Sequence, residues 1–328
     1  SIAIPDVDPD EHIVELIRSS SQSLERLHIG HVTDFDIVCL VANSRSPEQS
    51  LVYPRLKHLV ADNFIRGASL PQLLSNPFPA LETLRCQYLP TRMASFVLRE
   101  NRACLRHLAI DMTTMLGVLR AGIEAGNGPF ANLNLLHVHP HHASGVIAKQ
   151  DALLLAELLE LCPHLSTLRM ELSLGSGVED ILPTLRVPLA VRHLDLMLAP
   201  RTIGQVAAII CACPQLVGLK FGLVDGPDAP VDDPPTDETI QRYLDAYRGT
   251  ASGICHLELT LLHIDGHRRR AESIVLLAAM FPTLIGVYIP WRVADLEDRF
   301  ADDLRHAIDR PVYKNVTHLQ GVLYDWDS

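Results

Sequence analysis

The segment Cys162-Pro-His-Leu-Ser-Thr-Leu-Arg-Met170 returns with changed polar residues as Cys213-Pro-Gln-Leu-Val-Gly-Leu-Lys-Phe221. Both carry the pattern Leu-x-x-Leu-x-apolar, in which we call the first Leu position one, the second position four and the last apolar residue position six. Eleven such segments lie 24 to 38 residues apart, about 29 on average, and begin at Leu24, Leu56, Leu81, Leu105, Leu133, Leu165, Val191, Leu216, Ile254, Leu284 and Val316. A period of this length indicates an array of stacked structural units.

Each repeat predicts a short strand, a loop, a helix and a return to the next strand. In five repeats a proline such as Pro163 precedes position one, and we expect it to end the preceding helix and to set an extended approach to the strand. A short strand cannot bury its apolar face alone, but it can when it stacks parallel to its neighbours with helices outside. Helices are predicted at 34–42, 93–99, 151–161, 202–211, 236–247, 272–280 and 294–308.

The Leu-x-x-Leu segments resemble the leucine-rich repeat family over almost the whole chain, and their Cys-Pro-x-Leu-x-x-Leu phrasing is similar to that of F-box/leucine-rich-repeat proteins. The resemblance implies an α/β solenoid (a horseshoe) of about eleven strand–helix repeats with a continuous parallel sheet on its concave side. A doubly wound α/β sheet would not repeat Leu-x-x-Leu at every strand. We expect one domain over 1–328, with an N-terminal capping helix region at 1–23, repeats at 24–312, and a last strand with a C-terminal cap at 313–328.

Side chains alternate along a strand, so positions three, five and seven are expected on the concave face, in rows spaced about 4.8 Å apart. Position three is His in five repeats, which is compatible with a half-exposed residue bonded to its neighbour, with a pH-dependent binding surface, or with catalysis. At position five, opposite charges alternate in repeats six to nine, which favours either cross-strand ion pairs or a polar contact strip for a partner. The candidate partner-binding residues are Arg85, His137, Arg169, Glu171, His193, Asp195, Lys220, His256, Glu258, Tyr288 and Trp291.

Position seven carries Asp111, His139 and Glu171 in consecutive repeats, beside a histidine run at 137–142. Imidazoles and carboxylates together could hold Zn²⁺. However, the chain contains no Cys-x-x-Cys or His-Glu-x-x-His spacing, and no nucleotide-binding loop or Gly-x-Ser-x-Gly. We therefore predict no metal, no cofactor and no catalytic residue, and keep a metal-binding protein or enzyme as an alternative.

Composition narrows the classes of partner. The 328 residues carry a net charge of −11, which argues against a nucleic-acid groove or an anionic membrane surface. No apolar run reaches the length of a membrane span. Seven scattered cysteines fit a reducing compartment, so we expect an intracellular protein, cytoplasmic or nuclear.

These features predict a non-catalytic protein-recognition module that binds a macromolecular partner on its concave face. The uneven repeats are similar to those of F-box/leucine-rich-repeat proteins. That resemblance implies an alternative, in which the chain is the substrate receptor of a ubiquitin ligase and meets the ligase scaffold through an F-box upstream of Ser1. Residues 1–20 are too short to hold such a motif, and the chain does not open with Met.

Overall fold

The structure is a computed structural model of the chain. It describes residues 1–4, 11–30, 35–36, 38–41, 51–66, 76–88, 91–111, 117, 129–139, 157–170, 190–196, 207, 209–211, 213–223, 236–247, 253–261, 267–284, 286–288 and 295–314. The chain divides into two compact units, Ser1–Gly175 and Ser176–Ser328.

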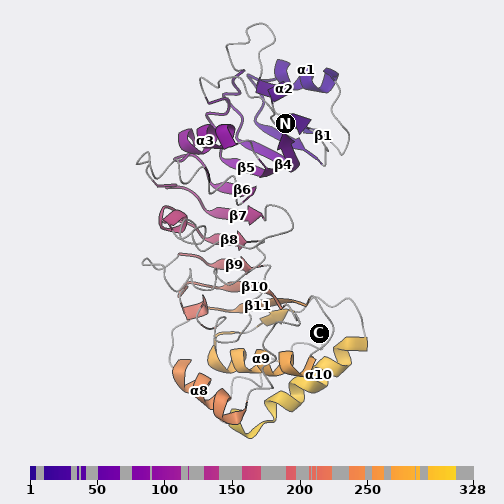
Figure 1. Cartoon of the computed structure of the whole chain (residues 1–328), viewed down its shortest axis with the longest axis vertical. Coiled ribbons are helices and arrows are strands. Elements are labelled where there is room, and N and C mark those ends of the chain that lie inside the picture. The colour runs from indigo at the N-terminus through magenta and orange to yellow at the C-terminus, as the bar shows by residue number, and fades with distance from the viewer. Residues whose placement is uncertain are drawn as a thin grey trace. The chain divides into compact units, whose positions relative to one another are not determined.

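The first unit is built around a parallel sheet whose strands follow chain order. Figure 1 shows the strands labelled β4 to β8 lying one after another. The order is β1-β2-β4-β5-β6-β7-β8. The strands are β1 Ile2–Ile4, β2 Arg26–Ile29, β4 His58–Arg66, β5 Thr83–Tyr88, β6 His107–Asp111, β7 Leu135–His139 and β8 Thr167–Met170, with β3 Phe35–Asp36 paired to the end of β4. Helices α1 Glu11–Ser19, α2 Val38–Val41 and α3 Thr91–Glu100 lie between strands.

The second unit repeats this plan. Its parallel strands are β9 His193–Leu196, β10 Gly218–Leu223, β11 His256–Leu261 and β12 Gly286–Tyr288, again paired in chain order. They alternate with α8 Asp237–Tyr247, α9 His267–Met280 and α10 Asp295–Ile308, which is followed by a short 3-10 helix, Pro311–Tyr313. Both units therefore have the α/β solenoid architecture that the sequence predicts.

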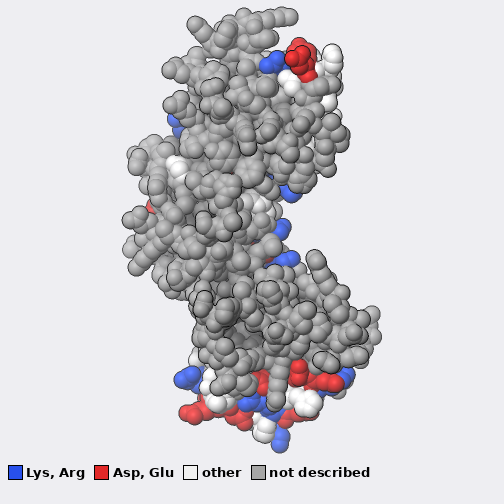
Figure 2. All heavy atoms as spheres, turned by 45° about the vertical axis from the view of Figure 1, so that its right-hand side comes forward, with Lys and Arg blue, Asp and Glu red and all other residues white. Residues whose placement is uncertain are grey.

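Three helices of the second unit are joined by one cation. The Nε of Arg310, just after α10, donates to Asp237 of α8 at 3.0 Å, and its Nη1 lies 3.5 Å from the buried Glu272 of α9. Figure 2 shows acidic and basic side chains intermixed over α8 and α10. No described helix is long and apolar enough to cross a membrane.

The leucines of the repeat form the buried core of each unit. All ten described residues at position one are buried, and so are the nine described side chains at position four. The latter are Leu27, Leu59, Leu84, Leu108, Leu136, Leu168, Leu194, Leu219 and Leu257. Because each fully buried side chain of this size contributes about 1.5–3 kcal/mol, stacking these rows supplies the stabilisation that a single short strand lacks.

A four-residue turn precedes the strand in six repeats. The N–H of position one donates to the carbonyl three residues earlier over 2.9 to 3.3 Å, as Leu165 does to Cys162. In five of these turns proline is the second residue, where its fixed φ suits the turn. The proline therefore shapes a tight turn, and does not set the extended approach that we expected.

At the start of many of the strands, a backbone carbonyl accepts two hydrogen bonds from the next repeat. At seven places in the described chain, the carbonyl at position two accepts the N–H groups of both position two and position three of the next repeat, over 2.7 to 3.1 Å. The Glu82 carbonyl, for example, binds the N–H groups of Arg106 and His107. The backbone donors at the start of these strands are thus already used.

Two local predictions were wrong or incomplete. The helix expected over 34–42 is instead a two-residue strand, β3, followed by the single turn α2. Residues 1–23 contain the expected helix, α1, but also β1, which pairs with β2. The strand expected near 316 lies outside the described residues.

Candidate functional site

Equal positions of neighbouring repeats form rows, and we call the face that carries positions three and five the open face. In the first unit, the position-five row runs from Ala3 through Arg85 to Arg169. Its members in order are Ala3, His28, Val60, Arg85, Ala109, His137 and Arg169. Arg85 is exposed, whereas His137 and Arg169 are half-buried.

In the second unit the position-five row runs Asp195, Lys220, Glu258 and Tyr288, paired one to the next. Asp195 and Lys220 are both half-buried. The strand register thus places the alternating charges of this row on adjacent strands. The side chains of Glu258 and Tyr288 lie outside the described residues, as do Glu171 and Trp291.

Histidines at position three alternate with small residues. The register runs His58, Thr83, His107 in the first unit and His193, Gly218, His256, Gly286 in the second. His58 Nδ1 lies 3.1 Å from the Thr83 hydroxyl, and a Cβ placed on Gly218 would meet His193 Nδ1 at 3.0 Å. Each of these two imidazoles therefore lies close to the small residue of the next strand. This supports the interpretation of His58 and His193 as residues in contact with a neighbouring strand.

Of the two described members of the expected position-seven row, Asp111 is buried and His139 is half-buried. Asp111 is only 1% exposed, and its charge contributes to a raised pKa of the buried Cys86 thiol, although burial is the larger cause. Its neighbour His139 packs against His137, with ring centroids 3.8 Å apart. Among the described residues, no three His, Cys, Asp or Glu side chains are grouped to hold a metal ion. Glu171, His141 and His142 lie outside that set.

Position two, which the sequence analysis did not consider, carries a ladder of opposite charges. Glu25, Lys57, Glu82 and Arg106 follow one another in consecutive repeats. The Glu82 carboxylate lies 3.6 Å from Lys57 Nζ and 3.7 Å from Arg106 Nε. The alternation of signs at this position was visible in the sequence and could have predicted the ladder.

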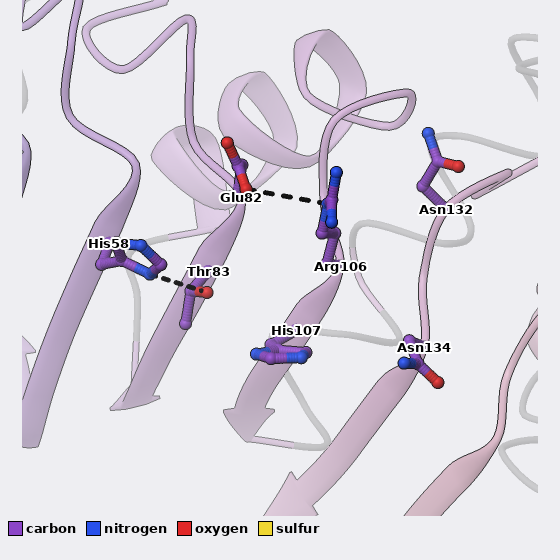
Figure 3. A pocket seen from close by; sticks show the side chains of 7 residues that line it. All are labelled: His58, Glu82, Thr83, Arg106, His107, Asn132 and Asn134. Atoms are coloured by element: carbon purple, nitrogen blue, oxygen red, sulfur yellow. Dashed lines mark hydrogen bonds and ion pairs between the residues drawn. The ribbon is translucent and has the colours of Figure 1, made fainter.

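A groove of about 460 Å³ lies where β4 to β7 begin, and we call it the strand-start groove (Figure 3). Six of its lining residues come from positions two and three of four consecutive repeats, and the seventh, Asn132, directly precedes position one. The lining residues are His58, Glu82, Thr83, Arg106, His107, Asn132 and Asn134. All of them have polar side chains, so the groove offers hydrogen bonds and charge.

Some of these side chains already have partners. Asn132 donates to the Ala103 carbonyl over 2.6 Å, and the Ser166 hydroxyl binds the side-chain oxygen of Asn134. Figure 3 shows His107 between the His58–Thr83 pair and Asn134. Arg106 and His107 are both exposed. The groove can therefore present the Arg106 guanidinium, the His107 imidazole and the Asn134 amide group to a ligand.

Comparison with known proteins gives no family assignment. No family model and no curated protein matches the chain. Among solved structures, the leucine-rich repeat-containing protein LegL7 from Legionella pneumophila matches 95% of this chain and 100% of its own, with a TM-score of 0.45 and 12% identity. A protein from Bacteroides fragilis matches 70% of this chain and 72% of its own, with a TM-score of 0.33 and 10% identity. Neither likeness bears on function.

Proposed function

We propose that the chain is a non-catalytic protein-recognition module whose open face binds a macromolecular partner. The observation that carries this proposal is the register of the first unit, which aligns equal positions of consecutive parallel strands and places Arg85, His137 and Arg169 in one row. Seven strands spaced about 4.8 Å apart span roughly 29 Å, which suits a protein surface of the usual interface size. Because the rows are fixed by the sheet, little conformational entropy is lost on binding.

The chemistry of the described residues favours recognition over catalysis. The residues that line the strand-start groove are all of polar type, so the groove lacks the hydrophobic side chains that predominate in a typical small-molecule site. The buried thiols also suit a structural role, since burial raises the pKa of Cys162 to about 12 and that of Cys213 to about 11. The role as a ubiquitin-ligase receptor and the intracellular location stay predictions.

Affinity purification with mass spectrometry tests the proposal. The bait is the whole chain with Arg85→Glu and His137→Glu, which changes the centre of the position-five row. The matched control is Arg55→Glu, an exposed cation in a turn of the same unit. We expect a partner that is retained by the wild type and by the control and is lost by the double variant. An identical set of captured proteins for all three baits would contradict binding through this face.

A further inference from the structure

The strand-start groove has donors to offer but few acceptors. Glu82 is held between Lys57 and Arg106, and the Thr83 hydroxyl is within hydrogen-bond distance of His58. The backbone N–H groups of Arg106 and His107 are used by the Glu82 carbonyl, so any contact with a ligand must come from side chains. The approach of Arg106 to Glu82 is through Nε, at 3.7 Å. A ligand in this groove therefore needs to be an acceptor of hydrogen bonds.

The charges at positions three and five around the groove also favour a ligand that accepts hydrogen bonds. The groove lining carries one cation, Arg106, and one carboxylate, Glu82, so it has no net charge, and Lys57 lies beside Glu82 at its edge. Positions three and five of the six strands from β2 to β8 in the first unit's sheet add three arginines and four histidines and no Asp or Glu. In a chain of net charge −11, this face is a local exception. Complementarity therefore favours an anionic group.

Two classes of anionic ligand, a single-stranded nucleic acid and a carboxylate on a polypeptide, differ in how well they fit the groove. A single-stranded nucleic acid is usually held by aromatic side chains that stack on its bases, and the groove lining contains no Phe, Tyr or Trp. A polyanion that extends beyond the groove also comes close to other acidic groups of a chain whose net charge is −11. A carboxylate on an otherwise near-neutral polypeptide meets only the groove, because charges beyond about 8 Å are screened at physiological salt.

We propose that the strand-start groove binds an Asp or Glu side chain of an extended acidic segment, whose carboxylate is held by Arg106, His107 and the Asn134 amide. This inference rests on the proposed function, since it names the chemistry of the partner. The segment runs across the strands, over the row that contains Arg85. An extended chain advances about 3.3 Å per residue and strands are about 4.8 Å apart, so acidic residues three apart span two strands. Arg85 and His137, which lie two strands apart, match that spacing.

A peptide titration tests the inference. The probe is a fluorescein-labelled peptide in which Glu recurs every third residue between alanines, and its counterpart carries Gln. Fluorescence polarisation is measured with the whole chain and with Arg106→Gln combined with His107→Ala. Both side chains are exposed, so the variant should fold, and its circular dichroism and urea midpoint check this. The matched control is Arg55→Gln.

We expect the wild type and the control to bind the Glu peptide at least tenfold more tightly than the Gln peptide. The groove variant should lose about tenfold in affinity, as expected for one charge-assisted contact of about 1.4 kcal/mol. Equal binding of both peptides, equal loss in the control, or tighter binding of a single-stranded oligonucleotide of the same charge would overturn the inference. If the acidic peptide fails while the open-face variant still loses its captured partner, the proposed function stands and only its chemistry is wrong.

Discussion

Replacing Glu82 with Gln separates the stability of the charge ladder from the binding chemistry of the groove. The carboxylate makes two ion pairs, at 3.6 Å to Lys57 and 3.7 Å to Arg106. Gln keeps the length and polarity of the side chain but removes the charge from both pairs. Because the same carboxylate weakens the positive potential of the groove, the substitution should lower stability and raise affinity for an acidic peptide.

The magnitude follows from distance and exposure. The side chain of Glu82 is 30% exposed, and those of Lys57 and Arg106 are 50% and 67% exposed. At such separations a pair of charges in a water-like environment attracts by about 1 kcal/mol, and the ordering of long side chains offsets much of this. Each pair should contribute about 0.2–1 kcal/mol, so the variant should lose about 0.5–2 kcal/mol. A buried pair would instead lose about 3–5 kcal/mol.

Urea denaturation at low salt and in 1 M NaCl measures this loss, since urea adds no ions. In ~1 M salt the screening length is about 3 Å, shorter than either ion pair, so the loss should fall below about 0.5 kcal/mol. In the peptide titration, removing a like charge near the bound carboxylate should raise affinity about threefold, or ~0.6 kcal/mol. A loss of stability that is the same at both salt concentrations, or an unchanged peptide affinity, would refute the reasoning.

Three further outcomes test the fold. Leu108→Ala removes a buried position-four side chain in β6 and should cost about 2–5 kcal/mol in urea denaturation, whereas the exposed neighbour His107→Ala should change stability by less than about 0.5 kcal/mol. Pro214→Ala should cost about 0.4–1 kcal/mol, because Pro214 stiffens the unfolded chain at a turn whose closing bond, from Leu216 to Cys213, remains; no change in the urea midpoint would argue against this turn. Burial raises the pKa of the Cys162 thiol to about 12, so the folded state resists a deprotonation that the unfolded chain undergoes near pH 9, and stability should fall as pH rises from about 9 toward 12. A Cys162→Ala variant should show a shallower decline in thermal midpoint over that range, and an unchanged decline would contradict the assignment.

The repeat itself could be predicted from the sequence because its signal is local and redundant. Positions one and four are filled by Leu in most repeats, and each must be buried for a short strand to be stable. The rows of the open face then follow from alternation along the strand, so the register of Asp195 with Lys220 needed no further information. These features depend on neighbours of the same kind, and eleven copies make the pattern hard to mistake.

Features that depend on a particular neighbour could not be predicted in this way. β3 exists because it pairs with residues 65 and 66, beyond the register shift that follows Ala61 in β4. Asp111, at the end of its strand, is buried although alternation places it outward, and after burial its charge is the second cause of the raised pKa of the Cys86 thiol. The ladder at position two was missed for another reason, since only positions three, five and seven were expected on the concave face.

The net charge of the chain and the charges beside the groove act over different distances. For this reason an acidic chain can contain a groove that binds acidic side chains. At low ionic strength, where the screening length is about 30 Å at ~0.01 M, an anion approaching the first unit feels much of the net charge of −11. At physiological salt it feels only groups within about 8 Å, and near the strand-start groove these include the cations Lys57 and Arg106 and the carboxylate of Glu82 between them. The net charge therefore selects against long polyanions, while the groove selects for a single carboxylate. A short acidic segment on a neutral partner is the ligand that satisfies both conditions.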